Sequence, residues 1–260
     1  MPDIPMTVVA LLCLASVAAG WIDAVVGGGG LLLLPALLLG LPSTTPAAWA
    51  LGTNKAVAIV GTSGAAVTYV RKAPVDVGMA VRIGLAALAG SSAGAFFAAG
   101  MSTDVLKPVI MVVLLAVAAF VILRPAFGTA PAPGPATRRQ RLAAIGLAGL
   151  GIGCYDGLIG PGTGTFLVLA LTALLRLDLV TASATAKIVN CCTNAGALAM
   201  FAWQGTVLWK LAALLAVFNL AGGTLGARTA LKQGSGFVRV VLLTVVLALV
   251  ANLAYEQWVA

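Results

Sequence analysis

The chain has 260 residues, of which 61% are apolar and only 8% are charged. Charged residues normally make up about a quarter of a soluble protein, so this composition excludes a water-soluble domain and predicts an integral membrane protein. The net charge of +8 does not indicate nucleic-acid binding, because the basic residues lie between apolar runs and lack the interleaved aromatic residues that bind single strands.

Apolar runs of about 20 residues recur along the chain, and this is the length that a helix needs to cross a bilayer. The chain begins without a basic n-region, so the first run is predicted to be a retained helix and not a cleaved signal. Two shorter apolar helices are expected near 30–41 and 164–176. The fold class is therefore predicted as all-α and polytopic, with spans near 5–26, 47–70, 78–100, 104–124, 141–159, 181–203, 207–230 and 236–257.

The second half of the chain repeats the first. The segment WIDAVVGGGGLLLLP returns as CYDGLIGPGTGTFLVL, and TNKAVAIVGTSGA returns as TAKIVNCCTNAGA. The repeat is too long for a solenoid unit, and in an apolar chain it indicates two halves around one central site. We predict a first transmembrane repeat at 1–124, a Pro-rich basic cytoplasmic linker at 125–140 and a second repeat at 141–260.

The distribution of Lys and Arg predicts how the halves are oriented. Connections 71–82, 124–141 and 228–239 are rich in basic residues and are expected in the cytoplasm, whereas 101–107 and 203–210 are poor in them. This pattern favours inverted halves with both termini outside, and it requires the two short helices to cross. Parallel halves would instead place 228–239 outside, against its charge.

A glycine stretch precedes each short helix. Glycine lets a ligand approach the backbone, and a helix N-terminus attracts anions through its free N–H groups. Broken helices in matching positions of two halves are a typical sign of a transporter site. The alternative interpretation is tight helix packing through small residues. The candidates for substrate binding are Gly28, Gly29 and Gly30, with Gly162, Thr163 and Gly164.

Lys55 and Lys187 lie at matching positions within predicted spans, where an unpaired charge costs at least about 2.5–3.5 kcal/mol. They either bind substrate, pair with Asp23 or Asp156, or reach an interface. Two such lysines with only two nearby acids indicate an anionic substrate. The two acids are also candidates for coupling transport to protons.

Polar residues beside the lysines are further candidates for substrate binding. Ser183, Lys187, Asn190 and Asn194 share one helical face, which predicts a hydrogen-bonding stripe directed into the protein. Asn54 is the candidate in the first half. Hydrogen bonds between helices are the competing role for each asparagine.

The segments ALGTNKAVAIVGTSGA, CYDGLIGPGTGTF and TASATAKIVNCCTNAGA resemble the TauE/SafE-type sulfite exporter family, which includes permeases similar to the 4-toluene sulfonate uptake type. The resemblance extends from about residue 8 to 255. It implies a bacterial inner-membrane permease with two homologous halves that moves sulfite or an organosulfonate.

These observations predict a multi-pass secondary transporter of small, sulfur-containing anions, which is not an enzyme and has no cofactor or metal. Its partners would be the lipid bilayer, the anion and protons as the coupling ion, and no nucleic acid. A passive anion channel is the first alternative. A thiol oxidoreductase using the adjacent Cys191 and Cys192 is a weaker one, and the absence of His excludes HExxH zinc and Ser-His hydrolases.

Overall fold

The computed structural model describes residues 4–42, 44–98, 134–160 and 162–258, and within these ranges the regular structure is entirely helical. The predicted all-α fold class is therefore confirmed. The described helices are α1 (Met6–Val26), α2 (Gly30–Gly40), α3 (Ala47–Val70), α4 (Val77–Ala98), α6 (Arg138–Ala143), η1 (Ala144–Gly151), α7 (Ile152–Leu158), α8 (Thr163–Leu175), α9 (Leu179–Trp203) and α10 (Trp209–Trp258).

The predicted helix bounds agree closely with the structure wherever the residues are described. The predicted span at 104–124 lies outside the described residues. The span predicted at 141–159 consists of α6, η1 and α7 in direct succession, with π-helical turns in η1. Helix α10 covers the last two predicted spans, which are separated by a break at Gly234 (φ 77°, ψ −174°), a conformation essentially restricted to glycine.

Several helices are long and apolar enough to cross a membrane. Met6–Val26, Val77–Ala98 and Trp209–Val245 each meet this condition, and α8 with α9 form a further candidate span that is bent by 119°. With its 11 residues, α2 is only about 16 Å long, roughly half the thickness of the bilayer core.

Helices of the two predicted repeats are interleaved. Helix α1 packs on α10, and η1 and α7 pack on α4, while α3 and α9 contact each other and pack on α10 and α4 respectively. Gly90 lies against the Leu150 carbonyl, and Gly222, its predicted counterpart, lies against the Val17 carbonyl. A side chain at either glycine would overlap that carbonyl, so small residues permit the close helix packing. Such matched contacts are expected of a duplicated chain, although the duplication itself stays a prediction.

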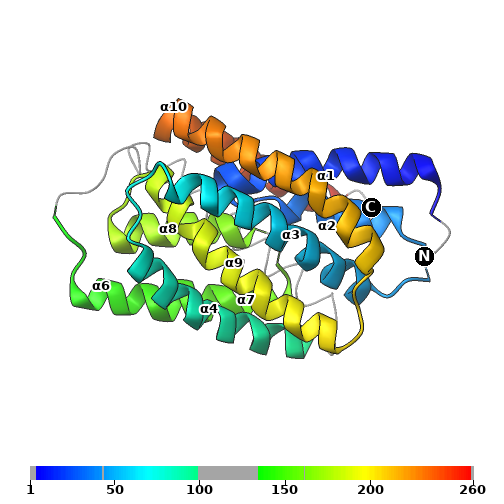
Figure 1. Cartoon of the computed structure of the whole chain (residues 1–260), viewed down its shortest axis with the longest axis horizontal. Coiled ribbons are helices and arrows are strands. Elements are labelled where there is room, and N and C mark those ends of the chain that lie inside the picture. The colour runs from blue at the N-terminus through cyan, green and yellow to red at the C-terminus, as the bar shows by residue number, and fades with distance from the viewer. Residues whose placement is uncertain (1–3, 43, 99–133, 161, 259–260) are drawn as a thin grey trace.

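The described parts of the connections that are predicted to share one side of the membrane lie at one end of the molecule. Figure 1 shows the α3–α4 connection, the start of α6 and the break in α10 at the left, whereas α1 begins and α10 ends at the right. Helix α3 runs from right to left and α9 runs from left to right. Opposite directions are expected of these counterparts if the halves are inverted, and the inversion itself stays a prediction.

Candidate functional site

Helix α1 ends inside the protein, and side chains from three other helices hydrogen-bond to its last carbonyl groups. The Tyr69 hydroxyl donates to Ala24 (3.0 Å), Ser183 to Val25 (3.0 Å) and Thr165 to Val26 (2.9 Å). A helix leaves its last four carbonyls without partners, and lipid supplies none. These hydroxyl groups therefore allow α1 to stop at depth, directly before the first glycine stretch.

The fourth carbonyl, that of Asp23, accepts a hydrogen bond from the Lys187 ammonium and another from the Gly27 amide. Lys187 Nζ also lies 3.0 Å from Asp23 Oδ2, so Asp23 and Lys187 form an ion pair. The Thr62 hydroxyl donates to the same carboxylate oxygen (3.1 Å). The Lys187 side chain is fully buried and that of Asp23 is 14% exposed.

A second ion pair joins Lys55 and Asp156. Nζ lies 2.7 Å from Oδ2, and both side chains are only 3% exposed. This oxygen has no hydrogen-bond partner of acceptable geometry, so the pair is a close ionic contact and not an aligned hydrogen bond. The Lys55 ammonium also lies beside Gly160, whose φ of +87° and lack of a side chain leave room for it.

The two pairs cross between the predicted repeats. Lys55 of the first pairs with Asp156 of the second, and Lys187 of the second pairs with Asp23 of the first. Each lysine lies eight residues after the first residue of its helix, α3 or α9. The four charges cancel, so the ion-pair interpretation of these residues holds, and an excess of positive charge is no longer an argument for an anionic substrate.

The two glycine stretches meet backbone to backbone. A side chain on Gly27 would overlap the backbone of Gly164, and one on Gly164 would overlap Gly27. Gly29 packs against Ala19 and Asp23, and Gly28 lies close to Val245 of α10. The packing interpretation therefore applies to Gly28, Gly29 and Gly164 in this conformation.

The starts of the short helices hold the other candidates of the glycine stretches. Gly30 is the first residue of α2 and is half-buried. Gly162 precedes α8 in the left-handed conformation (φ +84°), and the hydroxyl of Thr163 donates to the Gly160 carbonyl (2.7 Å). The Thr163 hydroxyl is thus committed to its own turn.

The candidate asparagines are all buried, as is the whole predicted stripe on α9. Asn190 Oδ1 accepts a hydrogen bond from the Thr193 hydroxyl (2.9 Å). Asn54 Oδ1 is buried next to Lys55 in the chain and has no hydrogen-bond partner. A buried acceptor without a partner is costly, so Asn54 keeps an unused acceptor, which suits a hydrogen-bond donor and not an oxyanion.

Sequence reasoning did not identify the roles of Tyr69, Thr165 and Thr62. A usable signal was present, because a helix that ends at Gly27 within the membrane requires donors for its last carbonyls. Which hydroxyls supply them depends on packing between distant helices. Among the described residues, no group of three His, Cys, Asp or Glu side chains converges as metal ligands would.

Comparisons with known proteins agree with this architecture. Residues 12–253 match the family described as sulfite exporter TauE/SafE. The chain is 33% identical to "Probable membrane transporter protein ORF9" of Sinorhizobium sp. over 97% of its length and 95% of the relative's. It is 32% identical to a "Probable membrane transporter protein" of Haemophilus influenzae over 98% of both chains, and 30% identical to YfcA of Escherichia coli K12, likewise described as a "probable membrane transporter protein", over 95% and 90%. No solved structure matches the chain significantly.

Proposed function

Because the chain belongs to the TauE/SafE sulfite exporter family and is a membrane transporter, we propose that it is a secondary transporter of a small anion across the bacterial inner membrane. The proposed substrate class is sulfite or an organosulfonate. The family description supports this class, and the crossed ion pairs in the protein core are the observation that supports a coupled mechanism.

In the proposed mechanism the substrate anion and a carboxylate compete for the same ammonium group. While Asp23 is ionised, it occupies Lys187 at 3.0 Å. When the carboxylate takes up a proton, it loses its attraction for the lysine, and an oxyanion of the substrate can replace it without leaving a buried charge unpaired. Entry of one anion would thus be linked to uptake of one proton.

The same exchange is available at Lys55 and Asp156. Helices α3 and α9, which carry the two lysines, pack against each other at the centre of the molecule. This arrangement suits a transporter whose halves rock around a central site and expose each pair to one side in turn.

The two alternatives lead to different expectations. A passive channel would conduct the anion without any dependence on the proton gradient. For a thiol relay the geometry offers little support, since all four cysteines are free and the adjacent Cys191 and Cys192 point to different sides of α9.

The test is sulfite flux into proteoliposomes that contain the purified protein. We expect an inward proton gradient to accelerate flux, Lys187→Ala to abolish it, and Lys210→Ala, which changes an exposed lysine near the start of α10, to leave it unchanged. Size-exclusion chromatography verifies that each variant is folded. Undiminished flux in folded Lys187→Ala would refute the site, and flux indifferent to the gradient would favour a channel. A thermal-shift series with sulfite, sulfonates, sulfate, carboxylates and neutral solutes tests the substrate class.

A further inference from the structure

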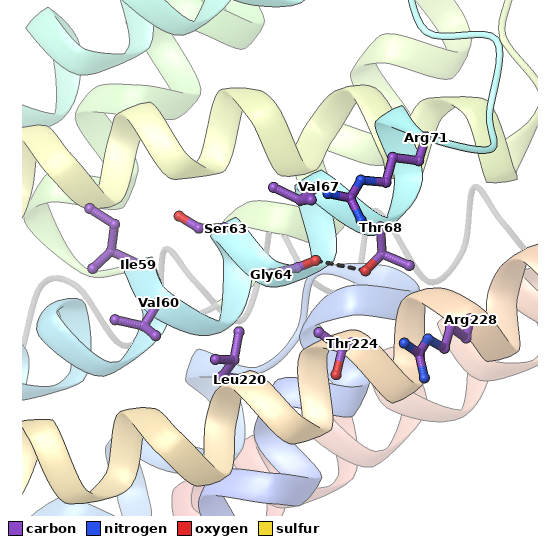
Figure 2. A pocket seen from close by; sticks show the side chains of 10 residues that line it. All are labelled: Ile59, Val60, Ser63, Gly64, Val67, Thr68, Arg71, Leu220, Thr224 and Arg228. Atoms are coloured by element: carbon purple, nitrogen blue, oxygen red, sulfur yellow. Dashed lines mark hydrogen bonds between the residues drawn. The ribbon is translucent and has the colours of Figure 1, made fainter.

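A groove of about 580 Å³ lies between α3 and α10, and none of the four ion-pair residues lines it (Figure 2). Figure 2 shows the guanidinium groups of Arg71 and Arg228 at one end of the groove and Ile59 and Val60 at the other. The floor is formed where α3 and α10 approach closely, because Gly64 has no side chain to displace Leu220. The groove is lined by Ile59, Val60, Ser63, Gly64, Val67, Thr68, Arg71, Leu220, Thr224 and Arg228.

The walls of the groove are apolar and face outward. Val60, Val67 and Leu220 are 37%, 51% and 37% exposed. The hydroxyls of Thr68 and Thr224 donate to carbonyls of their own helices, Gly64 and Ala221. Both hydroxyls therefore keep a hydrogen-bond partner when an apolar group occupies the groove.

The length of the groove is close to the thickness of the hydrocarbon region of one membrane leaflet. From Ile59 to Arg71 the helix rises by about 18 Å at ~1.5 Å per residue, and half of a bilayer core is about 15 Å thick. An occupant with its tail at Ile59 would therefore present its polar group to Arg71. Both arginines are exposed, and in the part of the chain that the structure describes neither takes part in a salt bridge.

The counterpart positions on the other helix pair lack this charge. Under the predicted repeat, Arg71 corresponds to Trp203 of α9 and Arg228 corresponds to Phe96 of α4. Tryptophan can anchor a helix at an interface, but neither tryptophan nor phenylalanine carries a charge that attracts anions. At the matching glycine the α4–α9 pair packs against backbone, because Gly196 faces the Leu88 carbonyl, whereas Gly64 faces the side chain of Leu220.

From these observations we propose that the α3–α10 groove binds one anionic phospholipid of the leaflet at the end where α3 and α4 are connected. The phosphate group lies between Arg71 and Arg228, and one acyl chain follows Val67 and Leu220 towards Val60. A guanidinium group can bind a phosphate through two parallel hydrogen bonds. Basic pockets between membrane helices bind anionic lipid headgroups. This site is separate from the transport site and does not depend on the proposed substrate.

The test is native mass spectrometry of the full chain in mild detergent with added phosphatidylglycerol or phosphatidylcholine. We expect one phosphatidylglycerol to be retained in preference to phosphatidylcholine. The double variant Arg71→Gln/Arg228→Gln should bind it about 25-fold more weakly, about fivefold for each arginine. The control Lys72→Gln/Arg82→Gln, which removes two exposed charges from the α3–α4 connection and the start of α4, should retain it.

A second variant separates a lipid from a soluble anion. Val67→Trp keeps both arginines but fills the groove, so it should also lose phosphatidylglycerol. Equal binding by the arginine variant and its control would overturn the proposal. Unchanged binding by Val67→Trp, with displacement by glycerol phosphate, would assign the arginines to a soluble anion instead. Melting curves of each variant show that it is folded, and Arg228→Gln alone serves if the double variant is not.

Discussion

The two ion pairs contain the same residue types at matching positions, but the protein surrounds them differently. Asp23 accepts hydrogen bonds from Thr62 and Lys187 on its carboxylate, and its side chain is 14% exposed. Asp156 is 3% exposed, and the oxygen that faces Lys55 has no aligned donor. In this conformation the Asp23 carboxylate is therefore more accessible than that of Asp156.

The difference shows that access, and not the identity of the charged groups, distinguishes the two halves. Under the proposed mechanism only a carboxylate in contact with water can exchange its proton. Inverted halves that rock against each other would interchange the surroundings of Asp23 and Asp156. The asymmetry of the pairs would then mark one of two conformations.

The largest loss of stability is expected from breaking the more deeply buried ion pair, Lys55–Asp156. Lys55→Ala leaves the Asp156 carboxylate buried without its cation, and this should lower the free energy of unfolding by about 3–5 kcal/mol. Lys187→Ala should cost less, because Asp23 keeps the Thr62 hydroxyl and is less buried than Asp156. Thermal and denaturant unfolding in detergent measure both. Equal losses would show that the difference in surroundings has no energetic consequence.

Much of this site followed from the sequence. Lys55, Lys187, Asp23 and Asp156 stood out because charges are rare in apolar spans, and the repeat placed them in matching positions. The helix bounds followed from the lengths of the apolar runs and from the glycine breaks.

The pairing across the repeats did not follow from the sequence. From the sequence, each lysine could pair with Asp23 or with Asp156. Which pairs form depends on how α3 and α9 pack between α1 and α7. The glycines at 27 and 164 show the same limit. Their residue type allowed both a ligand site and close backbone contact, and only the packing of the breaks shows the contact.

A second prediction removes the feature that distinguishes the Asp23 pair. Thr62→Val deletes the 3.1 Å hydrogen bond to Asp23 Oδ2 without changing the shape of the side chain. A hydrogen bond to a charged group contributes about 1.5–3 kcal/mol, so stability should fall by about that amount. The matched control is Thr68→Val, whose hydroxyl only donates to the Gly64 carbonyl of its own helix. A comparable loss in the control would assign the effect to threonine replacement in general.

A third prediction tests the contact that links the two glycine breaks. Gly164→Ala adds a methyl group that overlaps the backbone of Gly27. The breaks must separate to admit it, and overpacking of this kind typically costs about 1–3 kcal/mol. Gly146→Ala is the control, because no atom lies within 4 Å of its added methyl group. Normal stability and flux in Gly164→Ala would mean that the breaks need not touch.

The smallest change in stability is expected when a whole pair is neutralised. Lys55→Met with Asp156→Asn removes both charges and keeps similar side-chain volumes. Neutral replacements of a buried pair are often tolerated or stabilising, so the free energy of unfolding should stay within about 1 kcal/mol of that of the unsubstituted protein. Sulfite flux should nevertheless be absent, because position 55 no longer carries an ammonium group that could bind the substrate anion.

This double variant separates a structural role from a transport role, which Lys55→Ala alone cannot do. A pair that only holds the helices together would give a stable and active protein once both charges are removed. A pair that exchanges its carboxylate for substrate would give a stable and inactive one. The same replacement at Lys187 and Asp23 completes the comparison. Inactivity of both double variants would show that each transport cycle uses both ion pairs.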